Sequence, residues 1–98
     1  MVITKKQNDK ELTINVQGRL DTTTAPNLEA EIDASLSGIQ SLIFDFNGLE
    51  YVSSAGLRVI LKAQKIMNVQ GSMKLINVID DIREVFDITG FSDILTVE

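Results

Sequence analysis

The chain has 98 residues, enough for one domain with a single core, and we expect that domain to span residues 1–98. Its formal net charge of −5 argues against direct contact with nucleic acid and against docking on an anionic membrane. The sequence contains neither cysteine nor histidine, which excludes disulfides, thiolate metal sites and a Ser–His nucleophile. It has no nucleotide-binding motif, no long apolar run and no signal-peptide pattern, so we expect a cytoplasmic protein without a membrane span, metal or cofactor.

The chain begins with two predicted strands. Val2–Lys6 forms a weakly patterned one, and the polar segment that follows contains Asn8-Asp9, a pair typical of turns. In Glu11–Gln17 apolar and polar residues alternate, which predicts a strand with one face buried. Together the two strands predict a β-hairpin at the start of the sheet.

A helix is predicted after Gly18-Arg19-Leu20-Asp21, because Pro26 suits a first helical turn and follows threonines that can cap it. The helix runs to about Leu36, and Ser37-Gly38 ends it. Asp21 lies just before the helix and is expected to accept hydrogen bonds from neighbouring backbone N–H groups. The acidic residues of the helix are expected on its solvated face. Its buried stripe comprises Ala25, Leu28, Ile32 and Leu36.

The apolar run Leu42–Phe46 predicts a strand buried on both faces, as in a parallel sheet covered by helices. Asp45 interrupts this run, and a carboxylate inside an apolar strand is costly unless it is paired. We therefore expect Asp45 at the end of the strand, bonded to loop N–H groups. The alternative is a place in a polar pocket beside Ser54. Asn47-Gly48 then marks a turn.

Ser53 and Ser54 lie at the start of a second predicted helix, where backbone N–H groups are unpaired and the helix dipole is positive. Ser53 is the better candidate for the N-cap, because its hydroxyl can accept from the N–H groups two or three residues further on. Ser54 is then the first helical residue and points outward. A phosphate there would be tolerated by the helix and would change any surface that docks on it. The simpler interpretation is a capping pair with no further role.

The second helix has a buried stripe and a basic face. Arg58, Lys62 and Lys65 share the basic face at helical spacing. Leu57 and Leu61 flank it, and the sequence leaves two interpretations equal: they lie at the edge of the core, or they are partly exposed contacts for a partner. The buried stripe comprises Gly56, Val59, Ile60, Ala63 and Met67.

Beyond this helix we predict a loop over residues 68–72, a strand over Met73–Val78, a third helix that starts at Asp80 and closes at Gly90, and a last strand over Ile94–Val97. The predicted order is β-β-α-β-α-β-α-β. Alternating strands and helices indicate right-handed crossovers and the α/β class, with helices packed against a mostly parallel, mixed sheet.

Four segments, in order and across nearly all of the chain, resemble the STAS domain of bacterial anti-sigma factor antagonists. Ser54 matches the phosphorylated serine of the family pattern D-S-S-G-L when Gly56 is aligned with its glycine. The aspartate of that pattern is replaced by Ser53, which leaves Ser53 as a rival phosphorylation site. The four segments are Gly18-Arg19-Leu20-Asp21 with Thr24-Ala25, the strand LIFDF, the junction YVSSAGLRVIL, and a late glycine followed by a short strand.

The resemblance implies regulation of transcription by partner switching, and no enzymatic activity. An unphosphorylated antagonist binds an anti-sigma factor that is itself a serine kinase, and so frees the sigma factor. Phosphorylation by that kinase releases the antagonist, and a PP2C-type phosphatase resets it. The residues that the resemblance assigns to the docking surface are Asp21, Thr22, Ser53, Ser54, Gly56, Leu57, Arg58 and Leu61.

Two other functions remain as alternatives. The first is a docking module of the same fold, in a signalling complex or beside a transporter, that does not depend on phosphorylation. The second is a small enzyme or nucleotide-binding protein, which the missing histidine, cysteine and nucleotide-binding motifs disfavour. The family commonly carries a further helix beyond the position of Glu98, so that helix is either dispensable or one face of the sheet is less covered.

Overall fold

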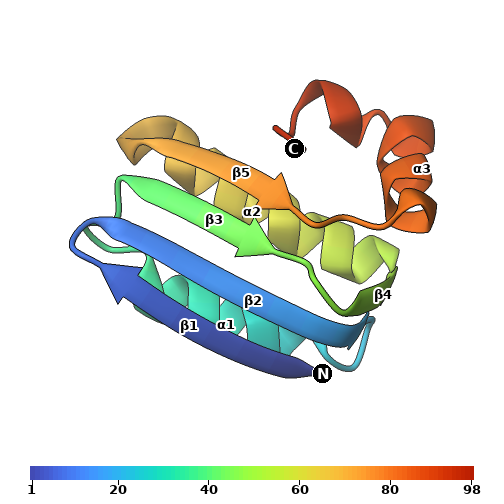
Figure 1. The fold of residues 1–98 in the computed structure, drawn as a ribbon, viewed down its shortest axis with the longest axis horizontal. Coiled ribbons are helices and arrows are strands. Elements are labelled where there is room, and N and C mark those ends of the chain that lie inside the picture. The colour runs from blue at the N-terminus through green and yellow to red at the C-terminus, as the bar shows by residue number, and fades with distance from the viewer.

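The computed structural model describes residues 1–98 as a mixed α/β domain (Figure 1). Five strands and three α-helices make up the fold, which confirms the predicted class. Along the chain the elements are β1 (Val2–Asn8), β2 (Glu11–Leu20), α1 (Ala25–Ser35), β3 (Ser41–Asp45), β4 (Leu49–Val52), α2 (Ser54–Gln70), β5 (Ser72–Ile76), α3 (Asp80–Thr89) and the short 3-10 helix η1 (Phe91–Asp93).

The strands form one mixed sheet in the order β1-β2-β3-β5, and β4 pairs with the far end of β2. β1 and β2 are antiparallel and make the predicted hairpin, whose turn holds Asp9 at a φ of 56°. The pairs β2–β3, β3–β5 and β2–β4 are all parallel. β2 is long enough to pair with β3 through its first half and with β4 through its last residues, so it connects the two ends of the molecule.

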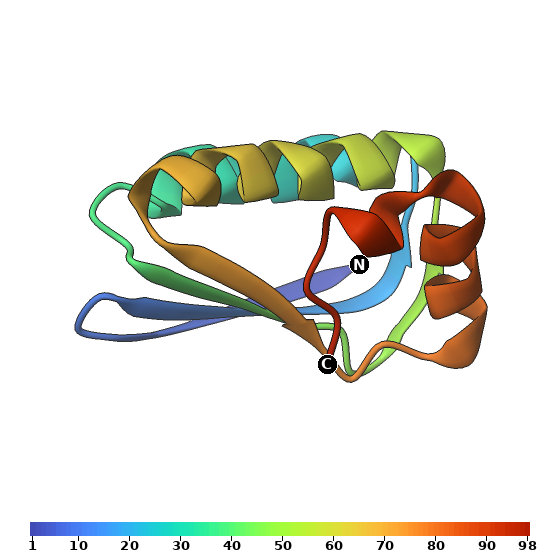
Figure 2. The ribbon, with the colours of Figure 1, turned by 90° about the horizontal axis from the view of Figure 1, so that it is seen from above.

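Helices α1 and α2 lie side by side on one face of the sheet, and the other face is open (Figure 2). The prediction that β3 is buried on both faces is therefore wrong: Leu42 and Phe44 are buried, whereas Ile43 and Asp45 are only half-buried. The reason lies in the topology. The sheet grows in one direction from β2 to β3 to β5, and successive right-handed crossovers in one direction place both helices on the same side.

A single apolar core fills the space between this face and the helices. The four residues of the predicted α1 stripe and the five of the α2 stripe are all buried, which confirms both helical patterns. Phe44 and Phe46 pack together with ring centroids 5.4 Å apart. No helix here combines the length and the apolar character that crossing a bilayer requires.

Three predicted elements differ from the structure. No strand is predicted between Gly48 and Ser53, yet β4 lies there and pairs with β2. The predicted loop over 68–72 is instead the last turn of α2, so Gly71 alone connects this helix to β5, which starts at Ser72 and ends at Ile76.

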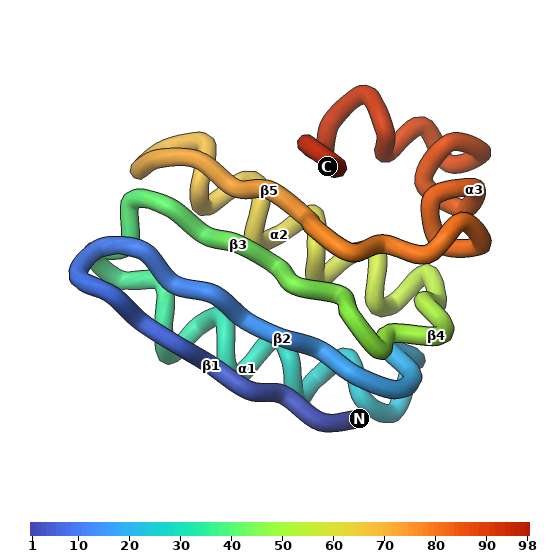
Figure 3. Tube along the Cα trace, viewed as in Figure 1, coloured from blue at the N-terminus to red at the C-terminus, as the bar shows by residue number.

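The predicted last strand, Ile94–Val97, is reduced to a single parallel bridge between Val97 and Leu75. Two backbone hydrogen bonds form it, from Leu75 N to Thr96 O at 2.9 Å and from Glu98 N to Leu75 O at 2.8 Å. The residues before it are taken up by η1, which turns the chain back from α3 towards β5 (Figure 3). Ile94 is half exposed, so the segment contributes Leu95 rather than an alternating strand to the core.

Gln64 is a buried polar residue within the apolar face of α2. Its Nε2 donates to Asn68 Oδ1 at 2.8 Å, but its Oε1 has no hydrogen-bond partner. A buried acceptor without a partner lowers stability. We expect Gln64→Met to raise the free energy of unfolding by about 1 kcal/mol, measured by urea denaturation.

Gln70 provides the matched control for this substitution. Its Nε2 donates to Leu36 O at 2.5 Å and to Ile39 O at 2.7 Å, and so holds the end of α2 against the end of α1. Gln70→Met is expected to lower the free energy of unfolding by about 1–2 kcal/mol, because it leaves both carbonyls without this donor. Equal losses from the two substitutions would show that the orphan oxygen of Gln64 carries no penalty.

Candidate functional site

The candidate site lies where the carboxyl ends of β2 and β4 meet the amino ends of α1 and α2. The last residues of the two strands, Leu20 and Val52, are paired, and Ser53 N donates to Leu20 O at 2.8 Å. Asp21 and Ser53 follow these paired residues directly. The pairing of β4 with β2 therefore brings together two segments that are far apart in the sequence and that the sequence analysis assigned to one docking surface. The carboxyl ends of strands are also where α/β sheets commonly carry their sites.

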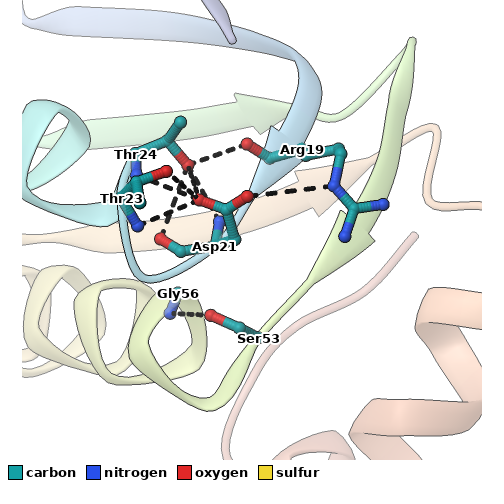
Figure 4. Close-up of polar contacts among 6 residues, drawn as sticks. All are labelled: Arg19, Asp21, Thr23, Thr24, Ser53 and Gly56. Atoms are coloured by element: carbon teal, nitrogen blue, oxygen red, sulfur yellow. Dashed lines mark hydrogen bonds and ion pairs between the residues drawn. The ribbon is translucent and has the colours of Figure 1, made fainter.

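Ser53 and Ser54 occupy the helix positions that the sequence predicts for them. Ser53 is the N-cap of α2: its backbone is extended, and its hydroxyl accepts a hydrogen bond from Gly56 N at 3.3 Å (Figure 4). Ser54 is the first residue of α2 and is exposed. Ser53, by contrast, is half-buried. The two hydroxyls thus differ, because one is engaged in the cap and the other is free at the helix end.

Asp21 closes the turn that leads into α1. Its Oδ1 accepts from Thr23 N at 3.0 Å, from Thr23 Oγ1 at 2.7 Å and from Thr24 N at 3.1 Å (Figure 4). Thr24 Oγ1 in turn accepts from Asp21 N and donates to Arg19 O, both at 2.8 Å. The expected local role of Asp21 is confirmed, since it satisfies backbone N–H groups before the helix. Thr24 is the N-cap residue, but its hydroxyl makes no capping bond.

These hydrogen bonds lower the pKa of Asp21 below 3.8, with the Thr23 hydroxyl as the largest cause and the Thr24 and Thr23 N–H groups adding to it. A carboxylate with a lowered pKa in the folded state contributes stability above pH 3.8, and that contribution is lost as the pH falls through the lowered value.

Asp21→Asn is therefore expected to lower the free energy of unfolding at pH 7. The difference in this free energy between the variant and the wild type should become smaller as the pH drops below 3.8. Urea denaturation at a series of pH values measures this difference. Asp9→Asn is the control, because the Asp9 carboxylate accepts no hydrogen bond, and Asn tolerates the positive φ at this position. A difference in the free energy of unfolding that stays constant from pH 7 to below pH 3.8 would contradict the stabilising role of the ionised Asp21.

Arg19 and Tyr51 form a surface pair beside Asp21 that the sequence analysis missed. They face each other across the β2–β4 ladder, and the Arg19 guanidinium carbon lies 4.1 Å from the centre of the Tyr51 ring. Arg19 Nε is also 3.8 Å from Asp21 Oδ2. Tyrosine and arginine are frequent in the centres of protein interfaces. Tyr51 and Val52, three and four residues after Gly48, were the available sequence signal for a strand here.

Two residues predicted for the docking surface are instead buried. Gly56 packs against β2, where a Cβ would lie 2.7 Å from Leu20 Cγ and 3.0 Å from Leu20 O. It lacks a side chain so that α2 can approach the strand. Leu57 is only 6% exposed, which decides for the core interpretation. Leu61 is half-buried and stays available at the surface.

The outer surface of α2 carries two grooves that meet at Arg58 and Lys62. One of about 310 Å³ lies between the first turns of α1 and α2 and is lined by Thr22, Pro26 and Ala55 among others. The other, of about 510 Å³, runs along α2. It is lined by Arg58, Leu61, Lys62, Lys65, Ile66 and Val69.

Lys62 connects α2 to α1 across these grooves. Its Nζ lies 2.9 Å from Asp33 Oδ1 and 3.2 Å from Glu29 Oε2. Hydrogen bonds to Asp33 first, and then to Glu29, raise the pKa of Lys62 above 10.5. The acidic face of α1, expected to be only solvated, therefore also holds the second helix.

Asp45 has the structural role that the sequence analysis favoured. It ends β3, and its Oδ1 accepts from Asn47 N at 3.0 Å and from Asn77 Nδ2 at 2.9 Å. These bonds tie together the loops after β3 and β5. Asp45 lines none of the grooves, and no hydrogen bond joins it to Ser54, so the alternative of a shared polar pocket finds no support.

Comparison with known proteins gives this fold and site a family. The sequence profile of the STAS domain matches residues 2–98. BtrV of Bordetella bronchiseptica, named as an anti-sigma factor antagonist, is 38% identical over 99% of this chain and 85% of its own length. The anti-sigma-B factor antagonist of Bacillus subtilis is 31% identical over 94% of this chain and 85% of its own length.

The solved structures of the Bacillus anti-sigma factor antagonist SpoIIAA share the fold at 20% identity. Its unphosphorylated form matches with a TM-score of 0.84, covering 99% of this chain and 88% of that one. Its phosphorylated form gives 0.77, with coverage of 99% and 91%. The chain belongs to the STAS domain family. Within this family it is similar to the anti-sigma factor antagonists.

Proposed function

We propose that this protein is an anti-sigma factor antagonist that regulates transcription by partner switching. Unphosphorylated, it binds an anti-sigma factor that is a serine kinase, and so frees the sigma factor. Phosphorylation of Ser54 releases it, and a PP2C-type phosphatase restores the binding form. The protein is the substrate of these enzymes and catalyses no step itself.

The observation that carries the proposal is the difference between the two serines at the start of α2. Ser53 is half-buried and its hydroxyl accepts from Gly56 N, whereas Ser54 is exposed and its hydroxyl has no hydrogen-bond partner. A kinase needs a hydroxyl that it can reach, which favours Ser54. The relatives named as anti-sigma factor antagonists support the proposed function, and SpoIIAA is a protein of this fold with a known phosphorylated form.

The surface proposed for the partner surrounds this hydroxyl. Thr22 contributes to it from the β2–α1 turn that Asp21 closes, and Arg58 and Leu61 continue it along α2. Phosphate adds about −1.5 to −2 charges at pH 7, which is enough to disrupt a desolvated contact at its centre. The charge at position 53 that the family pattern has is missing here, so the partner kinase reads a serine in its place.

Intact and peptide mass spectrometry, after incubation with candidate anti-sigma kinases and ATP, tests the proposal. We expect one added phosphate, localised to Ser54, and none on the Ser54→Ala variant. A phosphate on Ser53 would keep the switch and move its site by one residue. Binding without any phosphate from any candidate kinase would replace the switch with a phosphorylation-independent docking module.

A further inference from the structure

We propose that Arg58 binds the phosphate of phosphorylated Ser54 within the same molecule. The ligand is a phosphate monoester dianion, and the binding residue lies one helical turn after the modified serine. The proposal rests on Ser54 as the modified residue, and it adds what becomes of the phosphate afterwards.

Arg58 is a cation that forms no ion pair in the structure. It is exposed and takes part in none of the ion pairs of the structure. Lys62, its neighbour one turn further along α2, is bound to Glu29 and Asp33. The helix contains no acidic residue that could occupy Arg58 locally. Its guanidinium is therefore free to take a new anion.

Arg58 and Ser54 are neighbours on the surface of α2. Residues four apart on a helix are surface neighbours, about 5–6 Å apart between Cβ atoms. Helical side chains lean towards the amino end of the helix, so Arg58 leans towards Ser54. Arg58 also lines the groove that includes Ala55, the residue next to Ser54.

The guanidinium of Arg58 matches the chemistry of a phosphate. A phosphate offers three strong acceptor oxygens, and a guanidinium donates from a planar fork that can bind two of them at once. An anion placed before a cation in this spacing is the favourable order on a helix. The phosphate would thus occupy Arg58, which would no longer be available to a partner, and the net charge of the two residues would change from +1 to about −1.

The test uses phosphoserine introduced at position 54 during translation, so no kinase takes part. The second pKa of the phosphoserine, about 6, is measured by ³¹P NMR titration. We expect Arg58→Gln to raise this pKa by about 0.3 unit, because a helical ion pair of this spacing is lost. Arg58→Lys, which keeps the charge and loses the fork, should raise it by less.

Lys65→Gln is the matched control, since it removes one exposed, unpaired charge from the same helix three turns from Ser54. It should move the phosphate pKa by less than a third of the Arg58→Gln shift. Equal shifts from both variants would overturn the proposal, because they would reflect general charge only. So would an unchanged pKa in Arg58→Gln.

Phosphoserine at position 53 gives a second control. Position 53 is five residues before Arg58 and its side chain turns to Gly56 N, so Arg58→Gln should not affect a phosphate there. A loss of helical circular dichroism on phosphoserine at 54 would also contradict the proposal. Failure of every kinase to modify either Ser53 or Ser54 would reject the proposed switch and leave the pKa result standing, so the two proposals are tested separately.

Discussion

Phosphoserine at position 54 is expected to weaken binding to the anti-sigma factor about 100-fold, or about 2.7 kcal/mol, while the fold persists. The binding loss follows from a dianion placed in the middle of a desolvated contact. The fold persists because the Ser54 side chain is exposed, its hydroxyl makes no hydrogen bond in the unmodified protein, and it lies at the amino end of α2, where the dipole favours an anion. Isothermal titration calorimetry measures the affinity, and thermal unfolding measures the stability.

Two substitutions at position 54 separate the effect of the phosphate charge from the loss of the serine side chain. Ser54→Ala should bind as tightly as the wild type, because it removes the modification and no structural contact. Ser54→Asp should weaken binding by less than phosphate does, since one carboxylate carries less charge and fewer acceptor oxygens.

Ser37→Asp is the control for added charge. Ser37 is exposed and follows the end of α1, which Gln70 holds against the far end of α2. Ser37→Asp adds the same charge at the opposite end of the helix pair from Ser54, so it should leave affinity almost unchanged. A similar loss from Ser37→Asp and Ser54→Asp would mean that net charge, and not the position at α2, controls binding.

Gly71→Ala is expected to cost about 3 kcal/mol or more of the free energy of unfolding, a large part of what a domain of this size has. The reason is a close approach between two backbones. A Cβ on Gly71 would lie 1.9 Å from Gln40 O and 2.6 Å from Gln40 C, and neither atom can rotate away. The same Gln40 carbonyl accepts from Ser72 N at 3.0 Å, so the clash opens the start of β5.

Gly38→Ala is the control for a glycine lost from a nearby loop. A Cβ there would meet nothing within 4 Å, and only the φ of +78° opposes alanine, at about 1–2 kcal/mol. Urea denaturation followed by circular dichroism compares the two variants. If Gly71→Ala lowered the free energy of unfolding by no more than Gly38→Ala, the predicted clash between a Cβ at position 71 and Gln40 would be contradicted.

Much of the candidate site could be predicted from the sequence because its chemistry is local. The cap at Ser53, the exposure of Ser54 and the turn closed by Asp21 each depend on residues within about four positions, and all three agree with the structure. The surface around them could not be predicted as well. Arg19 and Tyr51 are neighbours only because β2 and β4 pair, and that pairing places a short strand where the local pattern indicated none.

The helical stripes, the hairpin, the turns and the capping serines follow from the amino-acid sequence alone, because periodicity and short-range hydrogen bonds act within one element. The burial of Leu57 and the partial exposure of Leu61 depend instead on how α2 packs against the sheet. The tertiary structure also leaves one face of the sheet open, because the strand order directs both crossovers to the same side. These contacts join residues distant in sequence, and no local pattern specifies them.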